Sequence, residues 1–502
     1  MRLILTVLLC AAALTGQTNP AALAARRWRM QHEKAIVTEF SSLLAIPNIA
    51  RDHANIRRNA DAIVAMLAKR GVPARLIQEP DANPVVYGEI RTPGAMRTIV
   101  FYAHYDGQPL DPKEWVTPPF APVLRDKSIE KDGRVIQLDT ASVPLDPEER
   151  IYARSSSDDK APIIAIAVAL DAINAAAIRF RSNIRFVFEG EEEAGSINFG
   201  RILQAHRDLF TGDVWLICDG PVSQNRQQLI AFGARGVQTV DITVYGARRE
   251  LHSGHYGNWA PNPAMMLARL LASMKDDNGR VLIDHFYDGI EPLSETEKRA
   301  IAEAPAPDAD LMKELWLGSS EASPAKLIER LQLPSLNIRG MASSRIGAQA
   351  SNVIPSTATA SIDIRLVKGM DHQVILSRLI DHIRKQGYFV TDIPPTHEIR
   401  MAHAKLAMVR TTDFGYNAVR TSMDLPISRE LIRVVESARG RTIKMPTMGG
   451  SVPLEAIERA VQTRTIAVPV ANHDNNQHSF NENIRLQNLW DGIELMAALL
   501  TM

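Results

Sequence analysis

The sequence predicts an α/β protein in which a domain with a mixed sheet flanked by helices is interrupted by an inserted α+β domain. The chain has 502 residues, too many for one ordinary domain, and 45% of them are hydrophobic, enough for a sizeable core. Strand-like and helix-like apolar runs alternate in its first and last parts. The middle part instead alternates apolar and polar residues with a period of two, as half-exposed strands do.

The predicted boundaries follow these changes of pattern. They place a signal peptide at residues 1–24, the first domain at 25–232 and 411–502, and the inserted domain at 233–410.

The N-terminal segment has the order of a secretory signal peptide. One positive charge at Arg2 precedes a short apolar run over residues 3–14, and Ala22-Leu23-Ala24 resembles a cleavage site. The run is too short to span a membrane, although an uncleaved anchor is the alternative interpretation. We therefore expect a secreted or periplasmic protein with no stable membrane span after cleavage. Cleavage would remove Cys10 and leave Cys218 as the single cysteine, which excludes an internal disulfide.

The first domain is predicted from apolar periodicity and turn residues. We expect helices at residues 26–44, 55–70, 160–177 and 484–500, and strands at 84–87, 98–103, 183–188, 213–218 and 464–470. In the inserted domain we expect strands at 237–245, 335–339, 358–365 and 388–393, and helices at 263–274 and 372–386. This second set predicts an antiparallel sheet with helices on one face.

The charge balance argues against a nucleic acid partner. The chain has 57 Lys+Arg and 57 Asp+Glu, so it offers no basic field for a polyphosphate.

Polar clusters directly after apolar strands are the strongest functional signal, because ligands of open α/β sheets bind at the carboxyl ends of the strands. The clusters are centred on His104 with Asp106, on Asp158, on Glu192 with Glu193, on Asp219, and on His478. Each has an ordinary alternative: a surface His–Asp pair, a helix N-cap, or a solvated acidic face. Together they form a nitrogen and oxygen ligand set without thiolate, suited to Zn²⁺, Mn²⁺ or Co²⁺. Two such ions bridged by a carboxylate could activate a shared water, with a free Glu as general base.

These motifs, in this order, resemble the M20 family of co-catalytic metallopeptidases, which contains carnosine dipeptidase-like enzymes, carboxypeptidases and amino-acid deacylases. The resemblance covers nearly the whole chain after the signal segment. It implies a di-metal exopeptidase-type catalytic domain and an inserted lid and dimerisation domain. It also implies one metal at His104, Asp158 and Asp219, a second at Asp158, Glu193 and His478, Glu192 as the base, and Asp106 orienting His104. A cis peptide is expected between Asp158 and Asp159.

The inserted domain carries further motifs of the same family. His252, in Leu251-His252-Ser253-Gly254, resembles a lid residue that reaches the partner subunit's active site and stabilises the oxyanion, which implies a homodimer. Asn352, Arg365, Gly450 and Ser451 resemble positions that hold the substrate, and the fork of Arg365 suits a C-terminal carboxylate. An exposed strand Arg and a Gly-Gly turn are the ordinary alternatives.

The sequence departs from the family pattern before Asp158. Ala153, Ser155 and Ala161 stand where the family has glycines, and an extra segment at about residues 127–149 precedes this motif. No equivalent of a second lid histidine is identified.

The sequence therefore predicts a secreted di-metal hydrolase that cleaves dipeptides or short peptides next to a free carboxylate. Zn²⁺ is the first expectation for both metals, with Mn²⁺ or Co²⁺ as alternatives, and Glu192 would activate a metal-bridging water. Two other functions stay open: a deacylase of N-acyl amino acids with the same machinery, and a non-catalytic metal or peptide binder.

Overall fold

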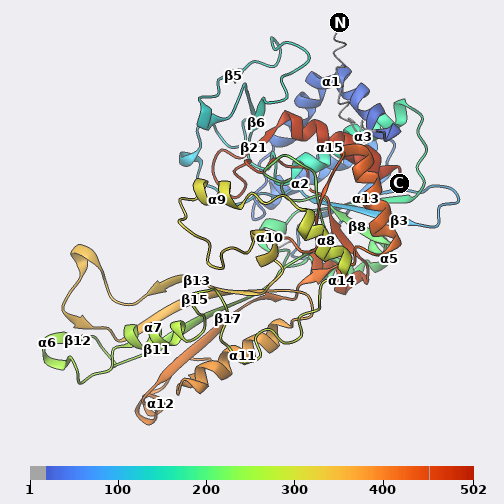
Figure 1. Ribbon diagram of the computed structural model, residues 1–502. Helices are drawn as coiled ribbons and strands as arrows, with labels where there is room; N and C mark the ends of the chain where they lie inside the picture. Colours follow the sequence, from blue (N-terminus) through green and yellow to red (C-terminus); the bar gives the residue numbers. More distant parts are fainter. Residues whose placement is uncertain (1–17, 451–452) are drawn as a thin grey trace, which may run out of the picture. The chain divides into compact units, whose positions relative to one another are not determined.

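The structure, a computed structural model, describes residues 18–450 and 453–502 and divides the chain into two compact units (Figure 1). The first unit comprises the chain up to residue 230 together with residues 425–443 and 468–502. The second unit comprises residues 231–424 and 444–467. Residues 1–17 of the predicted signal peptide, and Ser451, lie outside the described residues.

The first unit is built on a mostly buried mixed sheet. Its strands lie in the order β1 (Ala74–Ile77), β2 (Val85–Ile90), β7 (Asn183–Glu189), β3 (Thr98–His104) and β8 (Val214–Ile217). The short strands β20 (Thr465–Ala467), β9 (Leu229–Ala231) and β19 (Ile443–Met445) continue this order where the chain passes between units. Strand β3 pairs in parallel with both β7 and β8, so these three strands end at the same edge of the sheet.

Helices pack around this sheet. They are α1 (Pro20–Leu44), α2 (His53–Ala68), α3 (Lys160–Ala175), α4 (Phe199–Ala205), α5 (Arg207–Phe210), α13 (Pro426–Arg439) and α15 (Leu486–Leu500). Helix α3 lies in the core against β3, with α1 and α15 packed against it, and 13 of its 16 residues are buried. This explains its nearly continuous apolar sequence, because a helix buried on every side needs no polar face.

A smaller antiparallel sheet holds the segment before α3. Its order is β21 (Asn483–Arg485), β6 (Arg150–Tyr152), β4 (Val123–Arg125) and β5 (Val135–Ile136). The extra segment at about residues 127–149 contains β5 and the turn η2 (Ile129–Lys131), and the Ile129 N–H donates to the Tyr152 hydroxyl at 2.9 Å.

The second unit contains a five-stranded sheet covered by two helices. The strand order is β13 (Ser335–Ala342), β15 (Thr357–Leu366), β11 (Gly236–Tyr245), β17 (Leu406–Tyr416) and β16 (Phe389–Thr391). All pairs are antiparallel except β16 with β17. Helices α7 (Pro263–Ala272) and α11 (His372–Lys385) pack with alternate residues of β11 and β15 into one hydrophobic core. The other face of these strands carries polar residues.

Shorter elements complete the second unit. They are β10 (Gly233–Ala234), β12 (Leu251–His252), α6 (Ser253–Tyr256), α8 (Glu295–Glu303), α9 (Asp308–Glu314), α10 (Leu327–Arg330), β14 (Val353–Ile354), α12 (His397–Ala402), β18 (Val419–Arg420) and α14 (Leu454–Val461).

This architecture confirms the predicted α/β fold class. Several elements were not predicted, among them β17, an inner strand of the second unit's sheet. Helix α1 begins at Pro20, six residues before the predicted start at residue 26, because the Asn19 side chain caps it and proline is accommodated at the first helical position. The predicted signal peptide therefore overlaps the first turn of this helix. The helices that were not predicted are α4, α5, α6, α8, α9, α10, α12, α13 and α14.

Candidate metal centre and substrate-binding residues

The polar clusters that follow β3, β7 and β8 lie together in the first unit. Strand β3 ends at His104, β7 is followed by the turn η3 (Glu192–Ala194), and Asp219 comes two residues after β8. Because parallel strands in register end at the same edge, their following residues converge. His104, Asp219 and the side chains from η3 therefore share one site, as the sequence predicts.

His104 is fully buried and lies at the centre of this site. Its Nε2 atom is 3.0 Å from Asp158 Oδ1, 3.9 Å from Glu192 Oε2 and 4.0 Å from Asp219 Oδ2. On the other side of the ring, Nδ1 is 3.2 Å from the carbonyl oxygen of Asp106 and 3.5 Å from its Oδ1. Asp106 thus contacts the far nitrogen of the imidazole, which fixes the orientation of Nε2 toward the carboxylates.

Asp158 lies between the two histidines. Its Oδ1 faces His104, and its Oδ2 is 3.2 Å from Nε2 of His478, which is also 3.4 Å from Glu193 Oε2. This is the placement expected of a carboxylate that bridges two cations. The peptide bond between Asp158 and Asp159 is cis, as the family resemblance implies.

Within residues 18–450 and 453–502, two sets of three side chains have ligand atoms within 4.8 Å of one another. They are His104, Asp158 and Glu193, and His104, Asp159 and Asp219. The second set contains Asp159, which was not predicted to be a ligand. Asp159 Oδ2 accepts the His104 backbone N–H at 3.2 Å, and its buried Oδ1 has no hydrogen-bond partner among the described residues.

Burial, and then the crowding of carboxylates, raises the pKa values of three of these side chains. Burial, together with the charge of Asp158, raises the pKa of Glu193 to about 8 and that of Asp219 to about 6. Burial also raises the pKa of Glu192 well above its usual value, with Asp219 and Glu193 adding to the effect. Burial alone would raise the pKa of Asp158, but hydrogen bonds from His104 and His478 hold it below its usual value. Bound divalent cations would relieve this repulsion, so the donor set fits two of them.

Asp106 has a second role that the sequence did not reveal. Its carboxylate accepts the backbone N–H groups of Glu192 at 3.1 Å and Glu193 at 3.0 Å. Asp106 therefore holds the acidic turn in place as well as the His104 ring.

Sequence reasoning also missed two polar residues beside the cluster. Gln108 donates from Nε2 to Glu193 Oε2 at 2.6 Å, and the buried carboxylate of Glu482 binds the loop that carries Asp158. Both lie inside motifs that were recognised, but at positions where the family resemblance implies no metal ligand. Only the tertiary contacts reveal what they do.

In the second unit, His252 and Asn352 come together at the pairing of β12 with β14. The Ser253 N–H donates to the Asn352 carbonyl at 2.9 Å. The Gly254 N–H donates to Nδ1 of His252 at 3.0 Å, so the neutral ring carries its proton on Nε2. The His252 side chain is exposed and its ring lies 4.5 Å from that of His255.

Arg365 lies on the polar face of the second unit's sheet. Its Nε is 3.1 Å from the Asp363 carboxylate, and Ser335 on β13 is its cross-strand partner. Ser335 Oγ also accepts from Nη2 of the buried Arg235 at 3.0 Å, which brings the two arginines to the same end of the sheet. Burial, with the nearby charge of Arg365, lowers the pKa of Arg235 to about 10. Arg235 was not predicted.

The predicted Gly-Gly loop lies next to Arg235. The Arg235 N–H donates to the Met448 carbonyl at 3.3 Å, and Met448 forms an isolated bridge with Ala234. Gly450 is exposed. The structure therefore brings the loop that leads to Ser451 to the same part of the second unit as Arg365.

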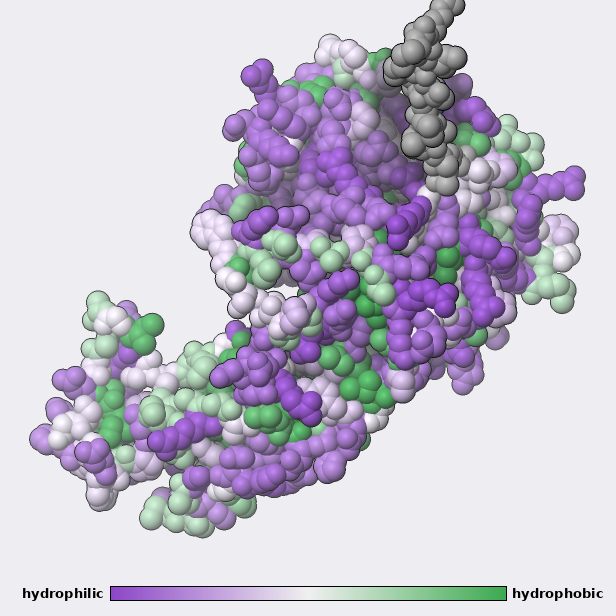
Figure 2. All heavy atoms as spheres, in the orientation of Figure 1, coloured by the Kyte–Doolittle hydropathy of each residue, from purple (hydrophilic) through white to green (hydrophobic). Residues whose placement is uncertain are grey.

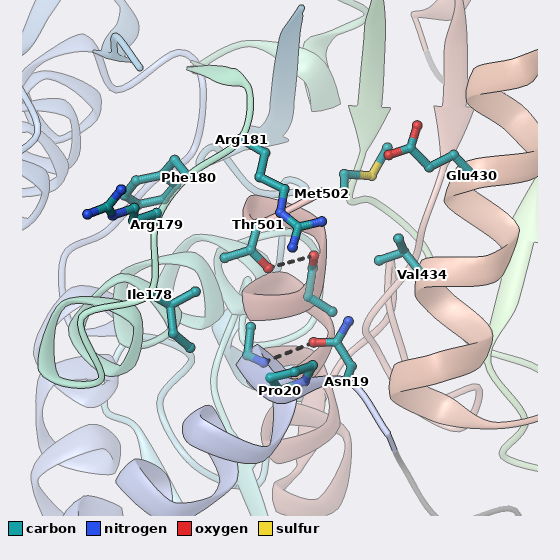
Figure 3. A pocket seen from close by; sticks show the side chains of 12 residues that line it. Asn19, Pro20, Ile178, Arg179, Phe180, Arg181, Glu430, Val434, Thr501 and Met502 are labelled. Atoms are coloured by element: carbon teal, nitrogen blue, oxygen red, sulfur yellow. Dashed lines mark hydrogen bonds between the residues drawn. The ribbon is translucent and has the colours of Figure 1, made fainter. Parts of the chain in front are cut away.

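The first unit also contains a cavity of about 560 Å³ that shares no residue with this cluster (Figure 3). The start of α1, the loop after α3, α13 and the end of the chain line it, and Asn19 and Met502 are both among the lining residues. No group of metal-ligating side chains lies in it among the described residues. The candidate metal centre of this unit is therefore the cluster around His104.

The match to known proteins covers most of the chain. Residues 100–502 match peptidase family M20/M25/M40. The chain is 24% identical over 490 residues to the Cys-Gly metallodipeptidase dug1 of Schizosaccharomyces pombe, covering 91% of this chain and 93% of that protein. It is 26% identical over 426 residues to the human Beta-Ala-His dipeptidase, covering 83% and 76% respectively.

Solved structures agree with this match. The M20 family metallo-carboxypeptidase Sso-CP2 of Sulfolobus solfataricus superposes with a TM-score of 0.73 at 25% identity, covering 93% of this chain and 98% of that chain. Human carnosine dipeptidase 1 superposes with a TM-score of 0.68 at 22% identity, covering 96% and 99%, and supports the fold. Among the described residues, no helix has the length and hydropathy needed to cross a membrane.

Proposed function

Because the chain belongs to peptidase family M20/M25/M40, and is a hydrolase of that family, we propose that it cleaves dipeptides or short peptides next to a free carboxylate. The observation that carries this proposal is the convergence of side chains from the ends of β3, β7 and β8 with Asp158 and His478, which come from two loops beside β6 and β21. Such a cluster is costly to bury unless cations compensate its charge.

Two divalent cations would be held by the two faces of this cluster. His104, Asp158 and Asp219 would hold one, and Asp158, Glu193 and His478 the other, with Zn²⁺ as the first expectation and Mn²⁺ or Co²⁺ as alternatives. When bound, the cations would polarise the scissile carbonyl and acidify a water molecule.

Glu192 is suited to move the proton. Its Oε2 is 3.9 Å from His104 Nε2, which is too far for a hydrogen bond. Its backbone N–H donates to Asp106, which holds the residue in place. In the proposed reaction its carboxylate takes the proton of the attacking water and gives it to the leaving amine.

His252 is suited to stabilise the oxyanion. Gly254 holds its Nδ1 as an acceptor, so Nε2–H is left to donate to the developing negative charge.

We infer a homodimer in which His252 serves the partner's site. Exposed apolar side chains of the same unit support the dimer: Tyr256, Trp259, Met265, Met341 and Ile346. Apolar side chains are visible at the end of the second unit where α6 and β12 lie (Figure 2). Light scattering should give the mass of two chains.

The free carboxylate of the substrate would be bound by the second unit. Arg365 offers a guanidinium for bidentate pairing, and Asn352, Gly450 and Ser451 are proposed to contact the same part of the substrate.

We also propose export through the N-terminal segment, which fractionation of the producing cells would test.

The experiment that tests the function is an assay of the purified, Zn²⁺-, Mn²⁺- or Co²⁺-loaded protein on dipeptides and N-acyl amino acids. Cleavage of dipeptides with a free carboxylate, faster than of their C-terminal amides, supports the proposal. Activity on N-acyl amino acids alone would favour the deacylase, because the same machinery performs both reactions.

A Glu192→Gln variant separates an enzyme from a binder. We expect it to bind both metals and to lose turnover by at least about a hundredfold, since a general base typically contributes 10²–10⁴. Glu191→Gln, a neighbouring carboxylate that accepts from Asn198 and Asn83 backbone N–H groups, is the control. Full activity of Glu192→Gln would contradict this mechanism.

A further inference from the structure

The two loops that carry Asp158 and His478 leave the small sheet at the same point. Strand β6 ends at Tyr152, opposite Asn483 at the start of β21. The loop to Asp158 follows β6, and the loop with His478 precedes β21. The Ala153 N–H donates to the Glu482 carbonyl at 3.1 Å, which extends this pairing by one residue.

At this point the Glu482 side chain is fully buried and accepts five hydrogen bonds. Its Oε1 accepts the N–H groups of Ser157 at 3.0 Å and Asp158 at 2.9 Å, and the Ser157 hydroxyl at 2.8 Å. Its Oε2 accepts the Ser155 N–H at 2.9 Å and Arg154 Nη1 at 2.8 Å. Every donor comes from the loop that ends in Asp158, whereas Glu482 itself belongs to the loop that contains His478.

Arg154 strengthens the same connection. Besides its ion pair with Glu482, its Nη2 donates to the Ser479 carbonyl at 3.1 Å, next to His478. Its guanidinium lies 5.1 Å from the centre of the Trp115 ring. A buried charge pair with this many hydrogen bonds holds both loops in one geometry, because removing either partner leaves an uncompensated charge.

The departure from the family's glycines fits this arrangement. Ser155 adopts φ 61°, a left-handed conformation that is unfavourable for a residue other than glycine. Its N–H is held by Glu482, and its hydroxyl accepts from Asn48 Nδ2 at 2.8 Å. A residue persists in such a conformation where its surroundings determine it, so the Glu482 contacts allow serine at a glycine position.

We propose that Glu482 is a positioning residue that fastens the Asp158 loop to the His478 loop and thereby sets the distance between these two metal ligands. This inference rests on the proposed two-metal site. The site of Asp158, Glu193 and His478 depends on it most, because two of its three ligands lie on the fastened loops. The other site takes His104 and Asp219 from the ends of β3 and β8, which the sheet holds independently.

The test compares Glu482→Gln with Glu494→Gln. Glu494 is also a buried carboxylate paired with arginines, Arg26 and Arg439, but it lies on α15 rather than beside the metal ligands. Zn²⁺ is titrated calorimetrically into the metal-free proteins. We expect Glu482→Gln to weaken one of two binding steps at least about tenfold and the other less, as loss of a residue that orients metal ligands does. Glu494→Gln should bind both ions as the unmodified protein does.

A second measurement uses the metal-free proteins alone. Amide hydrogen exchange over residues 153–160 should be at least about tenfold faster in Glu482→Gln, because the Ser155, Ser157 and Asp158 N–H groups lose their charged acceptor. The proposal would be overturned if a folded Glu482→Gln variant had the same amide exchange rates and the same two Zn²⁺ affinities as the unmodified protein. If Glu482→Gln does not fold, Ser157→Ala, which removes one donor, decides by the same criteria with a smaller expected change. An unmodified protein that binds no Zn²⁺ would refute the proposed function, while the exchange measurement still decides the role of Glu482.

Discussion

At the scale of single residues, the sequence identified side chains whose chemistry is typical of a metal site and missed those that hold them. His104 and Asp219 follow apolar strands, so their convergence could be predicted from the parallel order. Gln108 and Glu482 could not be assigned roles in this way, because an amide and an acidic residue near a motif have many ordinary uses. Their partners lie 85 and more than 320 residues away along the chain.

Gly254 provides a test of the His252 geometry. A Cβ atom at this position would lie 3.0 Å from Cε1 and 3.2 Å from Nδ1 of His252, so Gly254→Ala should displace the ring. We expect kcat to fall about tenfold or more with a smaller change in KM, since a displacement of about 1 Å can cost two orders of magnitude. Gly340→Ala, in the same unit with no atom within 4 Å of the added Cβ, is the control. Equal kinetics of the two variants would argue against a role of His252 in turnover.

Arg235 provides a test of charge at the proposed carboxylate site. Its Nη2 is held by Ser335 and the Leu333 carbonyl, and its buried Nε has no partner among the described residues. With Arg365 nearby and Asp363 as the counter-charge, Arg235→Met should remove positive charge from this end of the sheet. We expect kcat/KM to fall about tenfold for a dipeptide, which is the size of effect expected when a hydrogen bond to a charged group is lost. For the C-terminal amide, which carries no carboxylate charge, the fall should be small.

The control for this prediction is Arg339→Met, an exposed arginine of the same unit. Equal losses for the acid and the amide would indicate a purely structural role of Arg235.

At the scale of elements, periodicity predicted which segments are helices and strands better than where they end. Strand β15 alternates partly exposed and buried residues over its whole length, and the helix at Lys160 has an apolar sequence that only burial explains. Helix α13 was missed although Pro426 stands at its first position and its buried residues Leu431 and Val435 have the i, i+4 spacing of one helix face. The start of α1 was missed because its alanines also match a cleavage site.

The start of α1 leads to a stability prediction. Asn19 Oδ1 accepts the N–H groups of Ala21 and Ala22 at 3.1 Å each, and the Ser437 carbonyl accepts the Thr18 and Asn19 N–H groups. A chain beginning at Thr18 keeps all of these contacts and serves as the reference. In a chain beginning at residue 25, the free energy of unfolding should fall by about 2 kcal/mol or more. The lost cap accounts for about 1 kcal/mol and the lost buried alanine side chains for the rest.

Calorimetric melting of the two shortened chains is the measurement, and equal stability would show that this turn is dispensable. If the proposed export includes cleavage, we expect the mature N-terminus to precede Asn19 rather than to follow Ala24. Mass spectrometry of the exported protein would locate it.

At the scale of the whole molecule, the balanced charge conceals a strong local excess. The chain carries 57 residues of each sign, yet the buried site concentrates Asp158, Glu192, Glu193 and Asp219 around two histidines. Composition therefore argued against a polyanionic partner without indicating the site, whereas the motif order did indicate it. The family resemblance supplied the proposed assignment of ligands to two metals, which neither composition nor periodicity contains.

This excess makes the stability of the metal-free protein depend on pH in a defined direction. Glu193 and Asp219 have folded-state pKa values raised to about 8 and about 6, above ordinary values of 4.5 and 3.8. Between about pH 4 and 8 the folded state therefore holds protons that the unfolded state has lost. Since stability falls with pH wherever the folded state binds more protons, the metal-free protein should become less stable as pH rises through this window. The raised pKa of His478 acts in the same direction.

Metal binding should reverse this trend, because the cations bind the deprotonated ligands and replace their protons. We expect the melting temperature of the EDTA-treated protein to fall by about 3 °C or more from pH 5.5 to 8, since one proton contributes up to about 1.4 kcal/mol per pH unit. The Zn²⁺-loaded protein should show no such fall, and the stabilisation by Zn²⁺ should increase with pH. Glu193→Gln should flatten the metal-free profile, whereas Glu148→Gln, at an exposed carboxylate paired with Arg226, should leave it unchanged. A metal-free melting temperature that rises from pH 5.5 to 8 would contradict the crowding of carboxylates on which the proposed metal centre depends.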